Sequence, residues 1–302
     1  MSQPGINPYM AVILAVCAVS FGAIFTKAAE APPLIVALYR IGFTVLLLMP
    51  VTLATGWREL RAMGRRDLAL ATAAGVMLAL HFAAWITSLS YTSIASSTVL
   101  VNMHPLFTIA GGYLLYKERV SAKGLLGAGM ALAGSVVVGY GDFRIGGQAL
   151  YGDLLAFAGA FFVAGYMLVG RGIRGRLSLF PYIIVVYGAS VAVLLLAALF
   201  YQQPLYPYPP VTWLMFLLLA VFPTILGHTV FNWALRYVKA SVVSVSILGE
   251  PVGATILAYF AFGQIPVPMQ MAGGLLIIAG LVVFILFGTG GSDKPVKSTV
   301  SR

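Results

Sequence analysis

The chain has 302 residues, of which 61% are hydrophobic and 9% are charged. A soluble domain usually carries about 25% charged residues, so this composition excludes a water-soluble fold. The formal net charge of +10 would suggest a nucleic-acid partner for a soluble protein, but the basic residues lie in short clusters between apolar runs. That pattern is typical of membrane topology, and it predicts the lipid bilayer as a partner and no nucleic acid.

Ten apolar runs are long enough to cross about 30 Å of hydrocarbon, which takes about 20 helical residues. They predict an all-α integral membrane protein with ten transmembrane helices, at residues 9–29, 33–54, 68–90, 94–115, 122–140, 150–170, 179–200, 212–235, 241–263 and 268–288. The first run is too long for the core of a signal peptide, so we expect it to be retained. The polar residues 289–302 predict a disordered cytoplasmic tail.

Lys and Arg residues in short loops mark the cytoplasmic side of a membrane protein. With both termini in the cytoplasm, fifteen of the eighteen basic residues fall on that side. Lys27 and Arg144 then lie on the opposite side, and Arg40 lies within a span. We therefore expect an integral protein of the bacterial inner membrane with both termini cytoplasmic.

A weak internal repeat relates the two halves of the chain at a constant offset of 146 residues, without gaps. The matching pairs are Tyr91 and Tyr237, Pro105 and Pro251, Tyr113 and Tyr259, Gly127 and Gly273, and Gly134 and Gly280. Because the first half holds five spans, the second half starts on the opposite side of the bilayer, so the repeat is inverted. This predicts two repeats, 1–145 and 146–288, around a central cavity that opens to each side in turn.

Several local motifs accompany the repeat. They are a Tyr followed by small residues before two spans (Tyr91 to Ser97, Tyr237 to Ser241), the prolines Pro105 and Pro251, the run Lys117–Glu118–Arg119, the glycines Gly127 and Gly134, and Arg40. With these motifs, nearly the whole chain resembles the EamA-type exporters of the drug/metabolite transporter superfamily. The second half departs from the pattern, because Gln264 stands where Glu118 would be repeated. The resemblance implies ten helices in two EamA-like repeats and export of small metabolites from the cytoplasm, with amino acids among the commonest.

Ionisable groups within a membrane usually face the bundle interior or a water-filled cavity, because contact with lipid is costly. Glu250 is the only acid well inside a predicted span, and we expect it to contact a substrate amine or a coupling proton. A structural alternative also stays open, in which Glu250 bonds to neighbouring helices or pairs with Arg40. Pro105 and Pro251 each remove a helical hydrogen bond within a span, so we expect both to act as hinges.

The other candidates for a substrate-binding cavity are polar stripes and aromatic residues on apolar helices. They are Thr98 and Asn102, His81 and Trp85, His228 and Asn232, Ser244, and Tyr39, Tyr166 and Tyr187. Across the repeat, Thr98 corresponds to Ser244, and His104 corresponds to Glu250. Hydrogen bonding between helices and core packing are the alternative roles for these side chains.

Other classes of protein fit the sequence less well. Gly139–Tyr140–Gly141–Asp142 matches the GxGD signature of intramembrane aspartyl proteases, but its only candidate partner, Asp153, lies at the edge of a span. No metal-binding motif or phosphate-binding loop occurs, so we expect no enzymatic activity, no metal and no cofactor. The filter-like loops and charged rings of channels are not visible either.

The candidate residues favour a neutral zwitterion with an apolar side chain, because they combine hydroxyl, amide, imidazole and aromatic groups with few net charges. We therefore predict a secondary transporter that exports small neutral or aromatic amino acids by alternating access, with proton antiport and uncoupled transport both open. The alternatives are an exporter of cationic drugs or quaternary amines, and a carrier of nucleotide sugars or sugar phosphates. The latter would need more basic residues in the cavity than Arg40.

Overall fold

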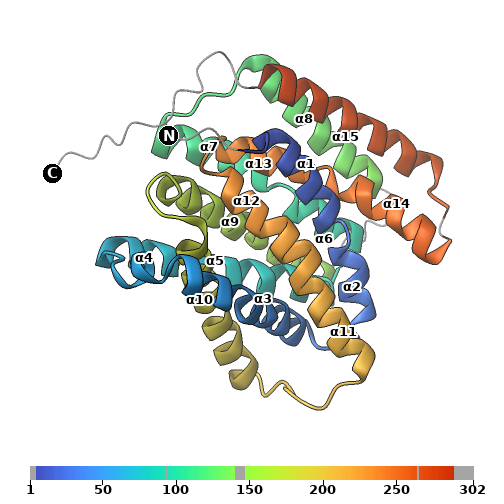
Figure 1. The fold of residues 1–302 in the computed structure, drawn as a ribbon. Coiled ribbons are helices and arrows are strands. Elements are labelled where there is room, and N and C mark those ends of the chain that lie inside the picture. Colours follow the sequence, from blue (N-terminus) through green and yellow to red (C-terminus); the bar gives the residue numbers. More distant parts are fainter. Residues whose placement is uncertain (1–4, 93, 140–146, 264, 289–302) are drawn as a thin grey trace.

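The computed structural model describes residues 5–92, 94–139, 147–263 and 265–288, and this part of the chain forms helices without any strand (Figure 1). The first half consists of α1 (Pro8–Val19), α2 (Gly22–Ala28), α3 (Pro33–Thr55), α4 (Trp57–Arg61), α5 (Arg65–Ser88), α6 (Ile94–Val101), α7 (His104–Tyr116) and α8 (Ala122–Gly139). The second half consists of α9 (Gln148–Ile173), α10 (Leu179–Phe200), α11 (Pro210–Leu219), the π-helix η2 (Ala220–Thr229), α12 (Val230–Ala234), α13 (Ala240–Ile247), α14 (Glu250–Phe262) and α15 (Pro268–Phe287). Asp142, Arg144, Gln264 and the predicted tail 289–302 lie outside the described residues.

Nine helical segments of the described chain are long and apolar enough to cross a membrane. A shorter apolar helix, Ala122–Val138, lies at the position of the fifth predicted span. The outside of the bundle carries large exposed apolar side chains, among them Leu46, Leu114, Leu126 and Leu196. Such a surface suits hydrocarbon rather than water. The prediction of an all-α integral membrane protein is therefore confirmed.

Prolines stand at the start of several spans. Pro8, Pro33, Pro210 and Pro268 begin α1, α3, α11 and α15. The first N–H groups of a helix have no partner within it, so a proline there removes no hydrogen bond, and its fixed φ angle suits the helix. These prolines therefore mark where the helices start.

Two spans are interrupted at equivalent positions. In the fourth span α6 ends at Val101 and α7 begins at His104, while in the ninth α13 ends at Ile247 and α14 begins at Glu250. The two breaks are separated by the same offset as the sequence repeat. Broken helices near the middle of a span are a known feature of transporters built from inverted repeats.

Tight turns replace the helical hydrogen bonds at the two breaks. The N–H groups of Met103 and Gly249 each donate to the carbonyl three residues earlier, at 3.1 and 3.0 Å. Pro105 and Pro251 then occupy the second position of α7 and α14, where a missing N–H leaves no gap in the helix. The prolines therefore follow breaks in the two spans and do not remove hydrogen bonds from a continuous helix as we expected, and their action as hinges stays a prediction.

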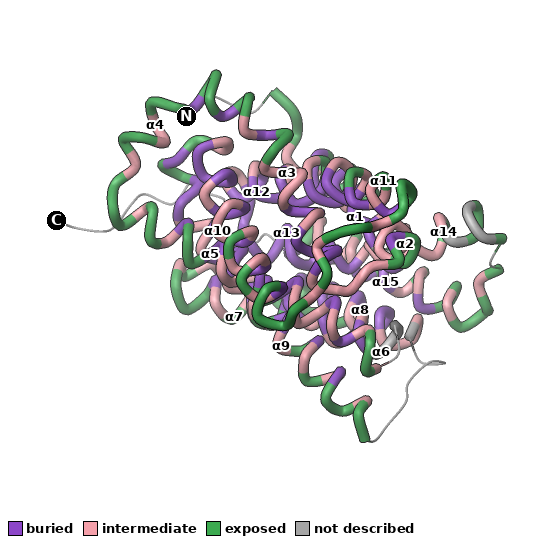
Figure 2. Tube along the Cα trace, turned by 90° about the horizontal axis from the view of Figure 1, so that it is seen from below, coloured by how far each residue is buried: buried purple, intermediate pink, exposed green. Residues whose placement is uncertain are grey.

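Contacts between the helices follow a two-fold pattern. α8 packs along α15, and α3 packs along α10, and in each pair the two helices correspond across the repeat (Figure 1). α5 packs on α9, and its counterpart contact joins η2 to α1. The buried residues gather along the middle of the bundle, where these elements meet (Figure 2).

Glycines form the seam between α8 and α15. A Cβ atom added at Gly127 would lie 2.7 Å from the carbonyl oxygen of Gly280, and one at Gly134 would lie 2.7 Å from that of Gly273. Small residues allow such close approach of helices in lipid. The contacts progress in opposite directions along the two helices, so these repeat-related helices are antiparallel, as an inverted repeat requires.

We predict that Gly127→Ala destabilises the protein by about 1–3 kcal/mol, because the added methyl group overpacks this seam. Gly129→Ala is the matched control on the same helix, since a Cβ atom there meets nothing within 4 Å. Unfolding of the purified protein in detergent measures both. Equal melting temperatures for the two variants would contradict the packing described for the seam.

Candidate functional site

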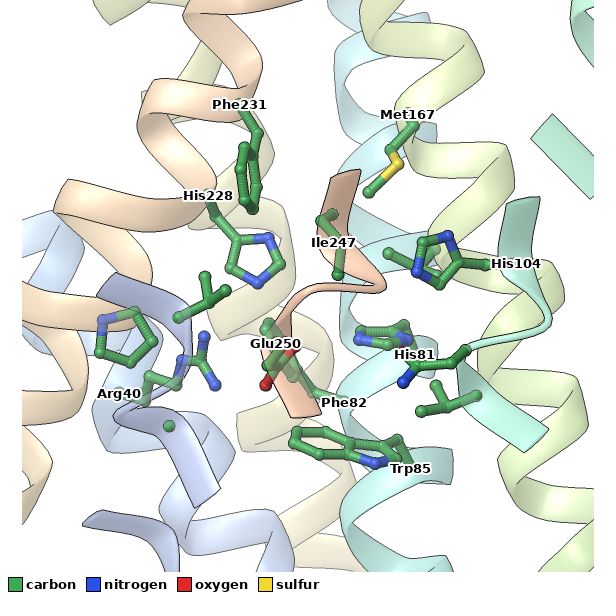
Figure 3. Close-up of a pocket in the computed structure, with 16 residues that line it drawn as sticks. Arg40, His81, Phe82, Trp85, His104, Met167, His228, Phe231, Ile247 and Glu250 are labelled. Atoms are coloured by element: carbon green, nitrogen blue, oxygen red, sulfur yellow. The ribbon is translucent and has the colours of Figure 1, made fainter. Parts of the chain in front are cut away.

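A cavity of about 50 Å³ lies between the two halves of the protein (Figure 3). Side chains from α3, α5, the two broken spans and the eighth span line it, together with apolar residues of the first and sixth spans. Its polar lining consists of Arg40, His81, Trp85, Asn102, His104, His228 and Glu250. All of these except His104 belong to the predicted set of cavity residues.

The cavity is small in this conformation. A single water molecule needs about 10–15 Å³ of such space, whereas pockets for drug-sized ligands measure about 300–1,000 Å³. The site is therefore contracted in this conformation.

Arg40 is the basic group of the cavity and is held on both sides. It is 2% exposed, its Nε donates to Thr224 Oγ1 at 2.9 Å, and its guanidinium carbon lies 4.5 Å from the Phe82 ring centroid. The hydrogen bond and the cation–π contact fix the guanidinium at the cavity wall. They leave its Nη groups directed at the cavity.

Glu250 lies opposite, at the first residue of α14 (Figure 3). Its backbone carbonyl accepts a hydrogen bond from Ser20 Oγ at 3.3 Å. Within the described residues its carboxylate accepts none, and no ion pair within 4.0 Å joins it to Arg40. The direct Arg40–Glu250 pair, one of the structural alternatives, is therefore absent from this conformation.

An aromatic wall is built by α5. His81 Nδ1 donates to the Gly159 carbonyl at 2.9 Å, which orients the ring. Trp85 follows one helical turn later, and the two rings lie 6.1 Å apart and nearly parallel, at 9°. The buried Trp85 Nε1 has no hydrogen-bond partner among the described residues. The wall thus presents the rings of His81 and Trp85 together with the Trp85 N–H, which has no partner among the described residues.

His104 connects the two halves across the cavity. Its Nδ1 shares a hydrogen bond with Ser244 Oγ of the ninth span, and both side chains are buried. Asn102, in the break between α6 and α7, lines the cavity beside it. His104 was identified in the sequence only as the repeat counterpart of Glu250, and the structure brings both residues to one cavity.

The eighth span contributes through its π-helical segment, η2. Such segments are rare and occur frequently at functional sites. Thr224 donates to the Leu219 carbonyl at 2.8 Å while it accepts from Arg40. His228 lies at the cavity with no partner for its Nδ1 among the described residues, and Asn232 donates to the His228 carbonyl at 2.9 Å. Pro223 lies inside this segment, where its missing N–H disturbs the helical hydrogen bonds, but a proline alone does not predict a π-helix.

Several predicted cavity residues lie behind the wall or away from it. Tyr166 and Asn232 are buried and hydrogen-bonded to each other behind His228. Tyr187, on α10, is fully buried and bonded to Thr229 at 3.1 Å. Thr98 is partly buried one turn from Asn102 and is not among the lining residues.

Tyr39 is the clearest departure from the predicted set. It directly precedes Arg40 on α3, so its side chain points to another side of the helix. Its hydroxyl donates to the Leu205 carbonyl at 2.8 Å, and its ring stacks on Phe216 with centroids 4.9 Å apart. Tyr39 therefore belongs to an aromatic cluster at the end of the bundle.

Sequence reasoning also missed the apolar lining of the cavity. Phe82, Met167, Phe231 and Ile247 all contribute to it (Figure 3). On an apolar helix, the sequence does not distinguish an apolar side chain that lines a cavity from one that packs in the core or faces lipid. Phe231 was the most accessible to prediction, because it lies three residues after His228 and thus on the same helix face.

The loops predicted to be cytoplasmic meet at one end of the bundle, where the two halves are tied together. Arg171 Nε contacts Glu118 Oε1 at 2.8 Å, and Arg176 contacts Asp67 at 2.7 Å. Lys239 donates to the backbone carbonyl of Arg119 at 3.3 Å. Each contact joins a residue of the first half to one of the second. This end is therefore closed.

Arg174 adds a buried charge to the same end. Its Nε donates to the Asn232 carbonyl at 3.0 Å, and its Nη1 donates to the Leu177 carbonyl. Burial lowers the pKa of the Arg174 guanidinium to about 10, so the group stays charged at neutral pH. A cation at the Asn232 carbonyl, in the last turn of α12, suits the negative end of that helix dipole.

The residues of the enzymatic alternatives can be located in the described part of the chain. No group of three or more His, Cys, Asp or Glu side chains is arranged there to hold a metal ion. Asp153, the second aspartate of the protease alternative, accepts a hydrogen bond from Thr92 at 2.7 Å and does not line the cavity.

Antiparallel repeats of apolar helices around a polar cavity define the class of membrane transporters with inverted repeats. Residues 7–140 and 150–286 each match the EamA-like transporter family. The chain belongs to this family, whose members are transporters, and the resemblance found in the sequence is confirmed.

Individual relatives are similar over much of the chain. An uncharacterized transporter of Archaeoglobus fulgidus is 26% identical over 90% of this chain and 94% of its own length. A probable amino-acid metabolite efflux pump of Salmonella typhimurium is 30% identical over 62% and 66%, and the pseudopaline exporter CntI of Pseudomonas aeruginosa is 23% identical over 73% and 76%. One crystal structure superimposes with a TM-score of 0.81 at 20% identity, over 93% of this chain and 97% of the other, and shows the same fold.

We predict that Glu118→Gln destabilises the protein by about 1–3 kcal/mol, because it leaves the buried Arg171 without its charge partner. The Glu118 and Arg171 side chains are 7% and 13% exposed, against 22% and 45% for Asp67 and Arg176. Asp67→Asn is thus the matched control, and we expect it to cost less than about 1 kcal/mol. Thermal unfolding in detergent measures both, and a larger loss for Asp67→Asn would refute the prediction.

Proposed function

We propose that the protein is a secondary transporter that exports small neutral or aromatic amino acids from the cytoplasm by alternating access. The main support is the cavity itself, which lies where the two halves meet and next to the breaks in both repeat-related spans. In this mechanism the halves rock about the breaks near Pro105 and Pro251, so that one side is closed at a time.

The chemistry of the cavity supports the proposed substrate. Arg40 and Glu250 supply one group of each charge, so a solute with no net charge matches the site. Trp85, Phe82 and Phe231 offer ring faces to an apolar or aromatic side chain. A relative named as a probable amino-acid metabolite efflux pump supports the same class of solute.

The proposal includes the direction of transport and the orientation of the protein in the membrane. The end tied together by Glu118–Arg171 and Lys239 carries the basic clusters and is taken as cytoplasmic. The conformation described here is then closed to the cytoplasm. Loading of a solute from that side requires these ties to open.

The decisive experiment is transport by the purified protein in liposomes. We expect saturable counterflow of labelled L-phenylalanine that is absent from protein-free liposomes, and a pH gradient will show whether protons move with it. Tests with L-tryptophan, L-tyrosine, L-methionine and L-threonine extend the range of substrates. A lack of saturable flux for all five amino acids would refute the proposed function.

We further predict that Trp85→Ala raises the KM for L-phenylalanine about threefold to tenfold, because it removes an aromatic contact worth about 0.5–1.5 kcal/mol. The KM for L-threonine should change less, since that side chain has no ring. Trp57→Ala is the matched control, because Trp57 lies on α4 and is 44% exposed. Equal changes for the two substrates would remove Trp85 from the recognition of the side chain.

A further inference from the structure

The cavity holds two charged groups of opposite sign that interact electrostatically but form no direct ion pair within the described residues. Within the described residues Arg40 makes one side-chain hydrogen bond, from Nε to Thr224, and the carboxylate of Glu250 makes none. Both line the cavity and face each other across it (Figure 3). A charge removed from water is costly unless it gains a partner, so each group is suited to a ligand charge of the opposite sign.

The two charges also belong to different halves of the protein. Arg40 is on α3 of the first half, and Glu250 begins α14 of the second. The guanidinium is held by Thr224 and Phe82, whereas Glu250 is held by its backbone, through the bond from Ser20. No hydrogen bond joins the two charges, but each of these two holding bonds links one half to the other, so the bonds at Thr224 and Ser20 must break when the halves separate.

We propose that Arg40 and Glu250 form a two-point site for the zwitterionic head group of an α-amino acid. The guanidinium binds the carboxylate through its Nη groups, and the Glu250 carboxylate accepts hydrogen bonds from the ammonium group. This assignment rests on the proposed function and extends it to the recognition of the head group. Guanidinium is well suited to this role, because its planar donors match the two oxygens of a carboxylate.

The side chain of the solute then lies toward the aromatic wall. Trp85 and Phe82 lie beside the two charges in the cavity (Figure 3). A solute with only one charge would leave the other protein charge unpaired, which is the basis for selection against simple amines and simple acids. Because the charges come from different halves, a bound zwitterion also joins the halves and favours closure around itself.

The test compares three compounds that differ only in their charged groups. L-phenylalanine carries both charges, 2-phenylethylamine lacks the carboxylate, and 3-phenylpropionate lacks the amine. Each competes against counterflow of labelled L-phenylalanine in liposomes that contain the full-length protein or its Arg40→Gln or Glu250→Gln variant. Thermal stabilisation of the purified protein by each compound gives a second readout that does not depend on transport.

For the unmodified protein we expect L-phenylalanine to bind about tenfold or more tightly than either analogue, as the loss of one charge-assisted contact implies. In Arg40→Gln the preference over 2-phenylethylamine should largely disappear, and the preference over 3-phenylpropionate should persist. In Glu250→Gln the reverse should hold. This crossed pattern is not produced by a general loss of stability.

The controls separate charge recognition from folding. The Glu250 carboxylate makes no hydrogen bond within the described residues, so Glu250→Gln breaks none and keeps the test informative even if Arg40→Gln fails to fold. Arg40→Lys retains the charge and should retain part of the preference. Asp67→Asn and Arg176→Gln remove charges at the closed end, away from the cavity, and should leave the ratios between the three affinities unchanged.

Two outcomes would overturn the inference. Equal competition by 2-phenylethylamine and L-phenylalanine in the unmodified protein would indicate a carrier of cations. Unchanged preferences in both variants would show that the two charges do not contact the head group. In either case amino-acid flux in the unmodified protein would leave the proposed function intact, whereas absence of all such flux refutes both.

Discussion

Every backbone N–H and C=O group in hydrocarbon needs a hydrogen-bond partner within the protein, because lipid offers none. The breaks in the fourth and ninth spans satisfy this constraint with turn hydrogen bonds at Met103 and Gly249, and with the bond from Ser20 to the Glu250 carbonyl. Such irregular backbone is tolerated where it lies within the bundle or lines a cavity. The position of the cavity follows from that requirement, since both breaks open onto it.

The architecture was accessible from the sequence because lipid imposes a strong signal. Apolar runs of about 20 residues mark the spans, and a constant offset between Pro105 and Pro251 or Gly127 and Gly273 marks the repeat. The internal structure of the spans was less accessible. The interruption between α1 and α2 falls at Ser20 and Gly22, and η2 contains Pro223, but none of these residues by itself specifies a break or a π-helix within an apolar run.

The candidate site was accessible only where polarity stands out against an apolar helix. Arg40, His81, Asn102, His228 and Glu250 do line the cavity, because an ionisable or amide group within a span has few other favourable places. Aromatic residues carry no such restriction, which is why Tyr39 and Tyr187 lie elsewhere while Phe82 and Phe231 line the cavity. Whether an aromatic residue lines the cavity depends on which face of its helix it occupies, and not on its residue type.

Charged side chains at the closed end form direct ion pairs, whereas those in the cavity form none among the described residues. Glu118 and Arg171 are paired at 2.8 Å across the two halves, whereas Arg40 and Glu250 face each other without an ion pair in the described part of the chain. The first arrangement ties the two halves together through a direct ion pair. The second leaves both side chains without a direct ion-pair contact, so each can accept a ligand group of the opposite charge in the proposed site.

The repeat gives His104 and Glu250 equivalent positions but different surroundings. His104 is engaged by Ser244, whereas no hydrogen bond joins Glu250 to Thr98, the counterpart of Ser244, within the described residues. A carrier with identical halves would present the same site to both faces of the membrane. Under the proposed mechanism of alternating access, an exchange of the two halves replaces an imidazole with a carboxylate, so we expect the two faces to differ in the solute concentration at which they become half-saturated. Such a difference would suit unequal solute pools on the two sides of the membrane.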